Sequence, residues 1–330
     1  MRICVIHLNQ IGDLVFSLPL LKALRDRYPD AEIHSVMKPY LKDLLAGSPL
    51  VNETIARQGG VRETLRLART LRRNRYDLLI SLARSEEAFI LTSLSRAGTK
   101  AGFVRFPFDM SLDVKELVLG HNSWYNNARL LDRLGIPRTA DTYVGLLPVE
   151  PAECNIIIPE PYVVISAGAS PRRLTKAWDE EKFAQLIVSL YERSSLRPVL
   201  VGAGDTRESN ALITLMVKND PKGKDIDVLD LTGKLNLRSL TALLMRAGLF
   251  VGIDSGVMHL ASASDIPVVA LFGPTDPYYV GPQNERSIVV RSDMECIPCY
   301  LDKSCRHIEC MRKLGTEQVM DACIRVMDRV

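Results

Sequence analysis

The sequence has no apolar run that approaches the eighteen or so residues needed for a membrane-spanning helix. Its first residues, MRICVIHLNQIGD, also lack the hydrophobic segment and cleavage site of a signal peptide, because polar side chains interrupt the apolar run. Neither glycine nor proline is in excess, and a formal net charge of +3 over 330 residues is too small to indicate a nucleic-acid partner. We therefore expect a globular cytoplasmic protein that does not bind nucleic acid.

Several short catalytic and nucleotide-binding motifs are missing as well, namely GxxxxGK[ST], HExxH and GxSxG. GAGDTRE at 202–208 resembles half of a dinucleotide-binding fingerprint, but Arg207 stands at the third glycine position. Asp225 and Asp227 form a DxD, the metal–diphosphate motif of one glycosyltransferase class. Its surroundings, PKGKDIDVLDLTGK, look like a loop before a short strand. We interpret both matches as coincidental.

Apolar runs of strand length recur along the chain, with helical patterns between them. Most of the runs are apolar throughout, which is typical of parallel strands that are buried on both faces. The alternation predicts an α/β fold of the doubly wound type. The predicted strands are 3–8, 31–37, 77–83, 162–168, 197–203, 248–253 and 267–273, and the helical patterns cover 13–28, 61–76, 179–194 and 237–247.

The length of 330 residues favours two domains, and one segment interrupts the alternation. Residues 145–162 contain four prolines and no sustained helical pattern, which indicates a linker. We assign 1–150 to one Rossmann-like domain, 151–162 to the linker, and 163–330 to a second Rossmann-like domain with a cysteine-containing tail. Two such domains facing each other would leave a central cleft lined by strand ends, where ligands bind.

In the C-terminal half, Asp254-Ser255-Gly256 separates a predicted strand from a helical segment. The first amides of a helix are unsatisfied donors with partial positive charge, and glycine lets a ligand approach the backbone, so the motif favours a phosphate. The alternative is that Asp254 or Ser255 only caps the helix. His259 lies on the first helical turn, where it can face the same pocket or be an ordinary core or surface residue.

The N-terminal half repeats this layout in Asn9-Gln10-Ile11-Gly12-Asp13. Asp13 stands at the start of an apolar helix, where an aspartate is often only a cap. The helix N-terminus favours the charged form of this carboxylate. An ionised carboxylate that faces a cleft is what a general base requires.

Two basic segments can each be interpreted in two ways. The loop SAGASPRRLTKAW at 166–178 contains Arg172, Arg173 and Lys176 before an acidic helical turn, so it either binds an anion or is solvated. The earlier helical pattern 61–76 carries arginines on one face, which is either a solvated face or a region of attraction to an anionic membrane. These arginines are Arg62, Arg66, Arg69 and Arg73.

Four of the seven cysteines lie within fifteen residues near the C-terminus, at Cys296, Cys299, Cys305 and Cys310. Four thiolates can close a tetrahedral zinc site, and His307 could replace one of them. We interpret the cluster as a structural zinc site or as free or disulfide-forming thiols. Neither alternative makes it the chemical centre.

Together these motifs resemble glycosyltransferase family 9, the heptosyltransferases of lipopolysaccharide core assembly. The most specific similarity is the block LTGKLNLRSLTALLMRAGLFVGIDSGVMHLASASDIPVVALFGPTDPYYVGP, residues 231–282, which resembles the family's donor site. The similarity extends to IGD with Pro19, Lys176-Ala177-Trp178, the segment 121–137 and the CIPC…CRHIECM tail. The resemblance implies a GT-B architecture, with the acceptor on the N-terminal domain and the nucleotide sugar on the C-terminal one.

The resemblance also implies inverting transfer of a heptose from ADP-heptose without a cofactor or a catalytic metal. The acceptor would be lipid A–Kdo or a core oligosaccharide, reached at the cytoplasmic face of the inner membrane. Asp13 would be the general base, with Asn9 and Gly12 in the acceptor loop. Lys176 would contact phosphate or sugar, Glu208 the ribose and the Leu235 backbone the adenine. Further donor contacts are implied for Ser170, Asp254, Ser255, Gly256 and His259.

Two other functions fit a scaffold of this kind. A nucleotide-sugar epimerase would turn over its substrate with no acceptor present, although the C-terminal loops lack the acid–base residues that such an enzyme needs. A non-catalytic protein that only binds a nucleotide sugar would not depend on Asp13.

Overall fold

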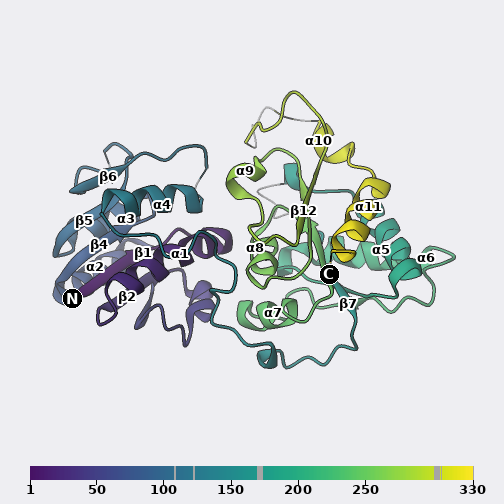
Figure 1. The fold of residues 1–330 in the computed structure, drawn as a ribbon, viewed down its shortest axis with the longest axis horizontal. Helices are drawn as coiled ribbons and strands as arrows, with labels where there is room; N and C mark the ends of the chain where they lie inside the picture. The colour runs from purple at the N-terminus through teal and green to yellow at the C-terminus, as the bar shows by residue number, and fades with distance from the viewer. Residues whose placement is uncertain (108, 122, 169–173, 301–304, 306, 330) are drawn as a thin grey trace. The chain divides into compact units, whose positions relative to one another are not determined.

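The computed structural model describes residues 1–107, 109–121, 123–168, 174–300, 305 and 307–329 (Figure 1). It divides into two compact units, Met1–Pro148 and Val149–Val330. Each unit contains a six-stranded parallel sheet, as the apolar runs predict. The predicted linker 151–162 includes the 3-10 turn Pro151–Glu153 and reaches the first residue of the next strand, Tyr162.

The sheet of the first unit has the strand order β3-β2-β1-β4-β5-β6. The order reverses direction between β1 and β4, so the loops that follow these two strands lie side by side at the carboxyl edge. Ligands of doubly wound sheets bind at such a switch point. The strands are β1 (Arg2–Ile6), β2 (Glu32–Met37), β3 (Glu53–Ala56), β4 (Tyr76–Ser81), β5 (Ala97–Phe103) and β6 (Val114–Glu116).

Helices cover both faces of this sheet. Helix α1 (Ile11–Arg27) packs with α4 (Trp124–Arg133), and α2 (Val61–Asn74) packs with α3 (Glu86–Leu94). Helix α1 is apolar almost all round and nearly wholly buried, because it is covered by both the sheet and α4. A short 3-10 helix, Pro39–Leu45, follows β2.

The sheet of the second unit has the order β12-β11-β10-β7-β8-β9, so its switch point lies between β7 and β10. Its three central strands are fully buried and rich in β-branched residues. The strands are β7 (Tyr162–Ser166), β8 (Arg197–Leu200), β9 (Leu229–Asp230), β10 (Leu249–Ile253), β11 (Val268–Phe272) and β12 (Ser287–Arg291).

In this unit α5, α6 and α11 lie together on one side of the sheet, whereas α7 and α8 lie together on the other (Figure 1). The helices are α5 (Glu180–Ser194), α6 (Arg207–Asn219), α7 (Leu237–Leu244), α8 (Gly256–Ala263), α9 (Pro277–Val280), α10 (Glu309–Arg312) and α11 (Thr316–Met327). Within the described part of the chain, no helix combines the length and apolar character that crossing a bilayer requires.

Candidate functional site

A buried ion pair marks the switch point of the second unit. The ammonium group of Lys176 is bonded to the carboxylate of Asp254, and each of the two side chains is 7% exposed. Thr275, which follows β11, donates a hydrogen bond of 2.6 Å to the same carboxylate oxygen. The Lys176 ammonium also lies 3.4 Å from the backbone oxygen of Asp254. Three loops, after β7, β10 and β11, therefore converge on one carboxylate.

The position of Lys176 follows from the buried Trp178. The Trp178 ring packs edge-on against Phe183, with 4.7 Å between ring centroids, and its Nε1 donates to the backbone oxygen of Leu314 at 3.0 Å. Lys176 ends the 3-10 turn Leu174–Lys176, two residues before this anchor. The tryptophan thus fixes the loop in the core, and the lysine is directed into the carboxyl edge.

The N-terminus of α8 adjoins this ion pair. Ser255 is the N-cap, and its hydroxyl accepts from the Met258 amide at 3.4 Å. The amides of Ser255, Gly256 and Val257 have no acceptor among the described protein groups, and these residues are half-buried. The cap therefore leaves three donors directed out of the helix end, where they can meet an anion.

His259 lies behind this helix end and is 4% exposed. Burial lowers the pKa of His259 to about 4, opposed by the charge of Asp254 and assisted by that of Lys176. A neutral imidazole therefore stands beside the ion pair at neutral pH.

The other predicted donor residues lie further along the same sheet edge. Glu208 is exposed on the first turn of α6, which follows β8, and Leu235 is half-buried in the loop after β9. The loop after β9 lies close to the start of α6. Gly233 of that loop has no Cβ atom, and one placed there would lie 3.5 Å from Nη2 of Arg207. Ser170, with Arg172 and Arg173, lies outside the described residues. Their roles as donor ligands stay predictions.

In the first unit, Asp13 lines a recess at the switch point between β1 and β4. The hydroxyl of Ser123, at the N-cap of α4, is buried in the wall and has no hydrogen-bond partner among the residues that the structure describes. The wall is otherwise formed by Leu8, Phe16, Leu82, Phe103, Asn126 and Asn127. Asp13 is half-buried on the first turn of α1, so its carboxylate reaches a partly enclosed space.

A buried arginine holds the turn before α1. Arg57, which is 1% exposed, pairs with Glu87 at 2.9 Å and donates to the backbone oxygen of His7 at 3.1 Å. It also donates to the side-chain oxygen of Asn9, whose backbone oxygen accepts from the Tyr40 hydroxyl. Asn9 is thus bonded from both sides, and Gly12 is buried in the following turn. No local sequence pattern identifies Arg57 and Glu87, because their ion pair joins residues far apart in the chain.

His7, in the first unit, is also buried and is fully enclosed. Its ring nitrogens lie 2.9 Å from the Ser17 hydroxyl and 3.1 Å from the Ser35 hydroxyl. Burial, followed by the charge of Arg57, lowers the pKa of His7 to about 3. The histidine is therefore neutral and joins β1, β2 and α1 by hydrogen bonds.

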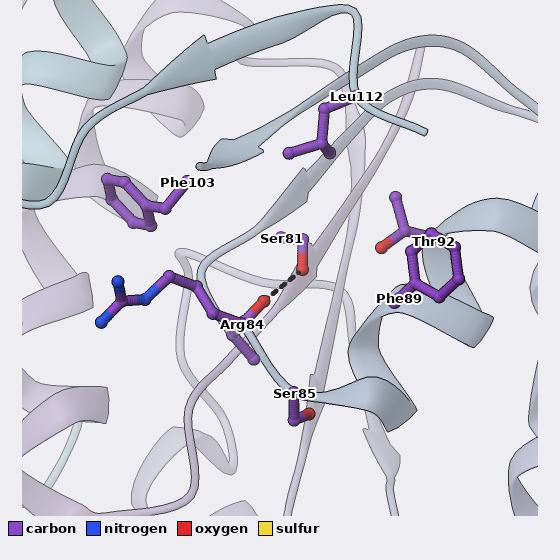
Figure 2. A pocket seen from close by; sticks show the side chains of 8 residues that line it. Ser81, Arg84, Ser85, Phe89, Thr92, Phe103 and Leu112 are labelled. Atoms are coloured by element: carbon purple, nitrogen blue, oxygen red, sulfur yellow. Dashed lines mark hydrogen bonds between the residues drawn. The ribbon is translucent and has the colours of Figure 1, made fainter. Parts of the chain in front are cut away.

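A second recess of the first unit adjoins the Asp13 recess, and Phe103 lines both of them. Figure 2 shows Arg84 and Phe103 on one side of it and Phe89 and Thr92 on the other. Ser81, Ala83, Ser85 and Leu112 complete the wall. No sequence motif marks this region, although its polar residues follow a predicted strand in the same way as Asp13 does.

The cysteine tail contains a thiol with a shifted pKa, that of Cys310. Burial raises the pKa of Cys310, and the neighbouring thiols of Cys299, Cys305 and Cys296 raise it further. No three His, Cys, Asp or Glu side chains among the residues that the structure describes are arranged to hold a metal ion. Cys296, Cys299, Cys305 and Cys310 all belong to that described set, so the zinc site stays a prediction that the described geometry does not support.

Comparisons with known proteins agree with this architecture. The model of glycosyltransferase family 9 (heptosyltransferase) matches residues 126–308. Lipopolysaccharide heptosyltransferase 3 of Escherichia coli strain K12 is 27% identical over 298 residues, which cover 84% of each chain. Lipopolysaccharide heptosyltransferase 2 of Salmonella typhimurium strain LT2 is 26% identical over 324 residues, 88% of each.

A solved structure, that of E. coli ADP-heptose lps heptosyltransferase II, matches with a TM-score of 0.82 at 21% identity. The match covers 100% of this chain and 99% of that chain. The fold is therefore GT-B, built from two doubly wound α/β units.

Proposed function

The chain belongs to glycosyltransferase family 9, the heptosyltransferases, and we propose that it transfers a heptose from ADP-heptose to a lipopolysaccharide inner-core acceptor with inversion. Curated relatives named as lipopolysaccharide heptosyltransferases align over 84% to 88% of the chain and support this reaction. The observation that carries the proposal is the carboxyl edge of the second unit, where unpartnered helix amides adjoin the Lys176–Asp254 pair.

The donor half of the reaction is assigned to the second unit. A diphosphate at the N-terminus of α8 would accept hydrogen bonds from the Ser255, Gly256 and Val257 amides. Lys176 would supply the positive charge that the leaving ADP requires, so these groups stabilise the departing diphosphate without a catalytic metal ion. His259, being neutral and buried, would shape the wall of the site. Asp254 would hold Lys176 in place through the ion pair.

The acceptor half is assigned to the first unit, with Asp13 as general base. Inversion requires attack in line with the departing diphosphate, so the base must act on the side of the sugar opposite to the leaving group. Asp13 would remove the proton from the acceptor hydroxyl as the new glycosidic bond forms and the bond to diphosphate breaks. Arg57 and Glu87 support this role indirectly, since they hold the Asn9 turn from which α1 begins.

The test uses ADP-heptose and a Kdo-bearing lipid A acceptor with the purified protein. We expect ADP release only when both substrates are present, together with an acceptor product one heptose larger. Conversion of the nucleotide sugar without an acceptor would identify an epimerase instead. Donor binding with no turnover on lipid A–Kdo or heptose-bearing acceptors would identify a binding protein and would refute the transferase.

We propose in addition that the protein works as a peripheral protein on the cytoplasmic face of the inner membrane, where a lipid-linked acceptor is displayed. Helix α2 supports this, because the four arginines on one of its faces, Arg62, Arg66, Arg69 and Arg73, are exposed. Arg66 lies 3.4 Å from the carboxylate of Glu63 on the same helix. Val61 and Leu65 on the same helix are exposed beside the stripe. Exposed arginines with interspersed apolar side chains fit an anionic membrane surface.

We also propose a structural zinc ion at Cys296, Cys299, Cys305 and Cys310, supported by the spacing of the four cysteines within fifteen residues, the first two of them as CxxC. Such an ion would stabilise the tail and take no part in transfer. Elemental analysis of the purified protein tests this. One zinc per chain, lost from a variant with Cys299→Ser, is expected, and metal-free protein of full stability would contradict it.

A further inference from the structure

Large apolar side chains are exposed along one short segment of the first unit, residues 104–125. The segment connects β5 to α4 and contains the edge strand β6. Phe106 is 83% exposed and Met110 is 68% exposed, so neither side chain packs in the core. Single exposed apolar residues are ordinary, but a group of them indicates a binding surface. The group consists of Phe106, Met110, Leu117, Leu119 and Tyr125.

Backbone pairing brings these residues to one region. Strands β5 and β6 are parallel, and the Val104 amide donates to the Glu116 backbone oxygen at 2.9 Å. The chain therefore leaves the two strands side by side, toward Phe106 from β5 and toward Leu119 from β6. The Asn126 side chain, on the first turn of α4, bonds to the Leu119 amide at 2.9 Å and to its backbone oxygen at 3.0 Å. Two loops and the start of a helix thus share one part of the surface.

Two carboxylates of the same segment are buried, although the apolar side chains are exposed. Asp109 accepts from the Arg105 amide at 3.2 Å, and Glu116 pairs with Arg133 at 3.0 Å and with Arg129. A buried carboxylate is costly unless it is paired and hydrogen-bonded, as both of these are. They fix the loops from within, so the usual distribution of apolar and acidic groups is reversed. The exposed apolar side chains are therefore a built feature of the segment.

The exposed side of the segment also carries positive charge. Arg105 and Lys115 are exposed there. Among the described residues of 104–125, Asp113 alone exposes a carboxylate, and it accepts from the Lys100 amide at 2.8 Å. Apolar side chains flanked by cations match the interface of an anionic bilayer. A second copy of the chain, docked through the same surface, would bring like charges together, so the lipid surface is the better match.

We propose that the 104–125 segment is a membrane-docking surface that inserts Phe106 and Met110 into the interfacial region of an anionic bilayer. The arginines of α2 supply an attraction that salt screens, whereas apolar insertion persists at high salt. The proposal rests on the proposed function in one respect, since a lipid-linked acceptor gives the protein its reason to attach to a membrane. Attachment itself requires neither donor nor acceptor.

The first test measures binding to vesicles at low and high salt, without substrates. One set of vesicles contains phosphatidylcholine alone and the other contains phosphatidylglycerol in addition. The variants are Phe106→Ser and the double variant Phe106→Ser with Met110→Ser. The matched control is Ile157→Ser, which removes an apolar side chain that is 92% exposed in a loop of the second unit. Thermal unfolding at the wild-type temperature confirms that each variant is folded.

The wild-type protein is expected to bind the phosphatidylglycerol vesicles and to retain part of this binding at high salt. Phe106→Ser should weaken the retained part about tenfold, the order expected for one large apolar side chain, and the double variant should weaken it further. Ile157→Ser should leave it unchanged. Equal binding of Phe106→Ser and wild type at high salt would overturn the docking surface. Self-association that depends on Phe106, with no binding to vesicles, would make a second copy the occupant and would also overturn it.

Insertion itself is measured with a tryptophan reporter. The two native tryptophans, Trp124 and Trp178, are buried, so a quencher on the lipid acyl chains acts chiefly on an added one. Phosphatidylcholine with brominated acyl chains, mixed with phosphatidylglycerol, should quench the emission of Phe106→Trp and leave that of Ile157→Trp unchanged. Equal emission of the two variants with these vesicles would contradict insertion.

Transfer to soluble and to vesicle-bound acceptors separates this proposal from the reaction. Phe106→Ser should act on a soluble core oligosaccharide at the wild-type rate and on a lipid-linked acceptor in vesicles more slowly than wild type. If no acceptor is glycosylated but the difference in vesicle binding holds, the proposed function fails and the docking surface stands. If transfer occurs and Phe106→Ser binds vesicles as wild type does, the docking surface fails alone.

Discussion

The ammonium group of Lys176 and the carboxylate of Asp254 pair inside the second unit, where both side chains are 7% exposed. Thr275 adds a hydrogen bond to the same carboxylate oxygen. A diphosphate arriving here meets a cation that already has a partner, so the free amides of α8 must provide much of the attraction. Asp254 is in this account a positioning residue for Lys176.

Removal of the lysine charge tests the pair. Lys176→Met leaves the Asp254 carboxylate buried without compensation, so we expect the free energy of unfolding to fall by about 3–5 kcal/mol. Adding Asp254→Asn to this variant should recover a large part of the loss, because the remaining charge is removed. Urea denaturation at neutral pH measures both. Equal stability of the single and double variants would contradict a coupled pair.

The Thr275 hydroxyl has a smaller expected effect. Thr275→Val keeps the shape of the side chain and removes the hydrogen bond to Asp254, which should lower the free energy of unfolding by about 1.5–3 kcal/mol, as for bonds to charged groups. Thr275→Ser retains the hydroxyl and serves as the control. ADP affinity, measured by calorimetry, should weaken in the valine variant more than in the serine variant if Thr275 holds Asp254 and Lys176 in place. A valine variant as stable as wild type would show that the bond contributes nothing.

Two of the buried histidines, His7 and His259, predict how stability depends on pH. Their folded pKa values are about 4 for His259 and about 3 for His7, both below the ordinary value of 6.5. Below pH 6.5 the unfolded chain therefore binds protons that the folded chain does not, and stability is lost as the pH falls. Each histidine contributes up to about 1.4 kcal/mol per pH unit, or about 2 kcal/mol at pH 5.

Denaturation with urea from pH 7.5 to pH 5 measures this loss above the range in which most carboxylates titrate. His7→Gln should remove about half of the slope while lowering stability at pH 7.5. A slope unchanged in this variant would mean that His7 is protonated in the folded protein or contributes no linkage.

The arginine stripe of α2 predicts binding to anionic vesicles. Changing Arg62, Arg66, Arg69 and Arg73 to glutamine should weaken binding to vesicles with phosphatidylglycerol by roughly 1 kcal/mol for each charge that reaches the surface. The matched control changes four exposed cations of the second unit, Arg193, Lys218, Lys224 and Arg325, to glutamine. Sedimentation at low and high salt provides the measurement. Equal losses in both variants would indicate a general charge effect and not a docking face.

Much of the fold follows from the sequence because its central strands are buried on both faces. All seven predicted runs are strands, and the GT-B class is confirmed. The missed strands lie at or near the sheet edges, where burial is incomplete and the pattern weakens. In β5, AGTKAGF, glycine and lysine replace the expected β-branched residues, and β9 has two residues. Local pattern cannot identify strands whose pairing is decided by neighbours far along the chain.

The site follows from the sequence only in part, for the same reason. Asp13, Lys176 and the Asp254–Gly256 turn stand directly after strands or at helix starts, so local chemistry marks them. Thr275 also follows a predicted strand, but its bond to Asp254 depends on the adjacency of β10 and β11. Arg57 and Arg84 follow β3 and β4 without any motif.

The general base is the central claim, and single-turnover transfer tests it most directly. Enzyme saturated with ADP-heptose and acceptor is compared with Asp13→Asn, which keeps the shape of the side chain and removes its basicity. We predict that the transfer rate falls by about 10²–10⁴, as for loss of a positioned base, while ADP affinity changes less than twofold. A transfer rate within tenfold of wild type would contradict the account and reduce Asp13 to a residue of the first helical turn.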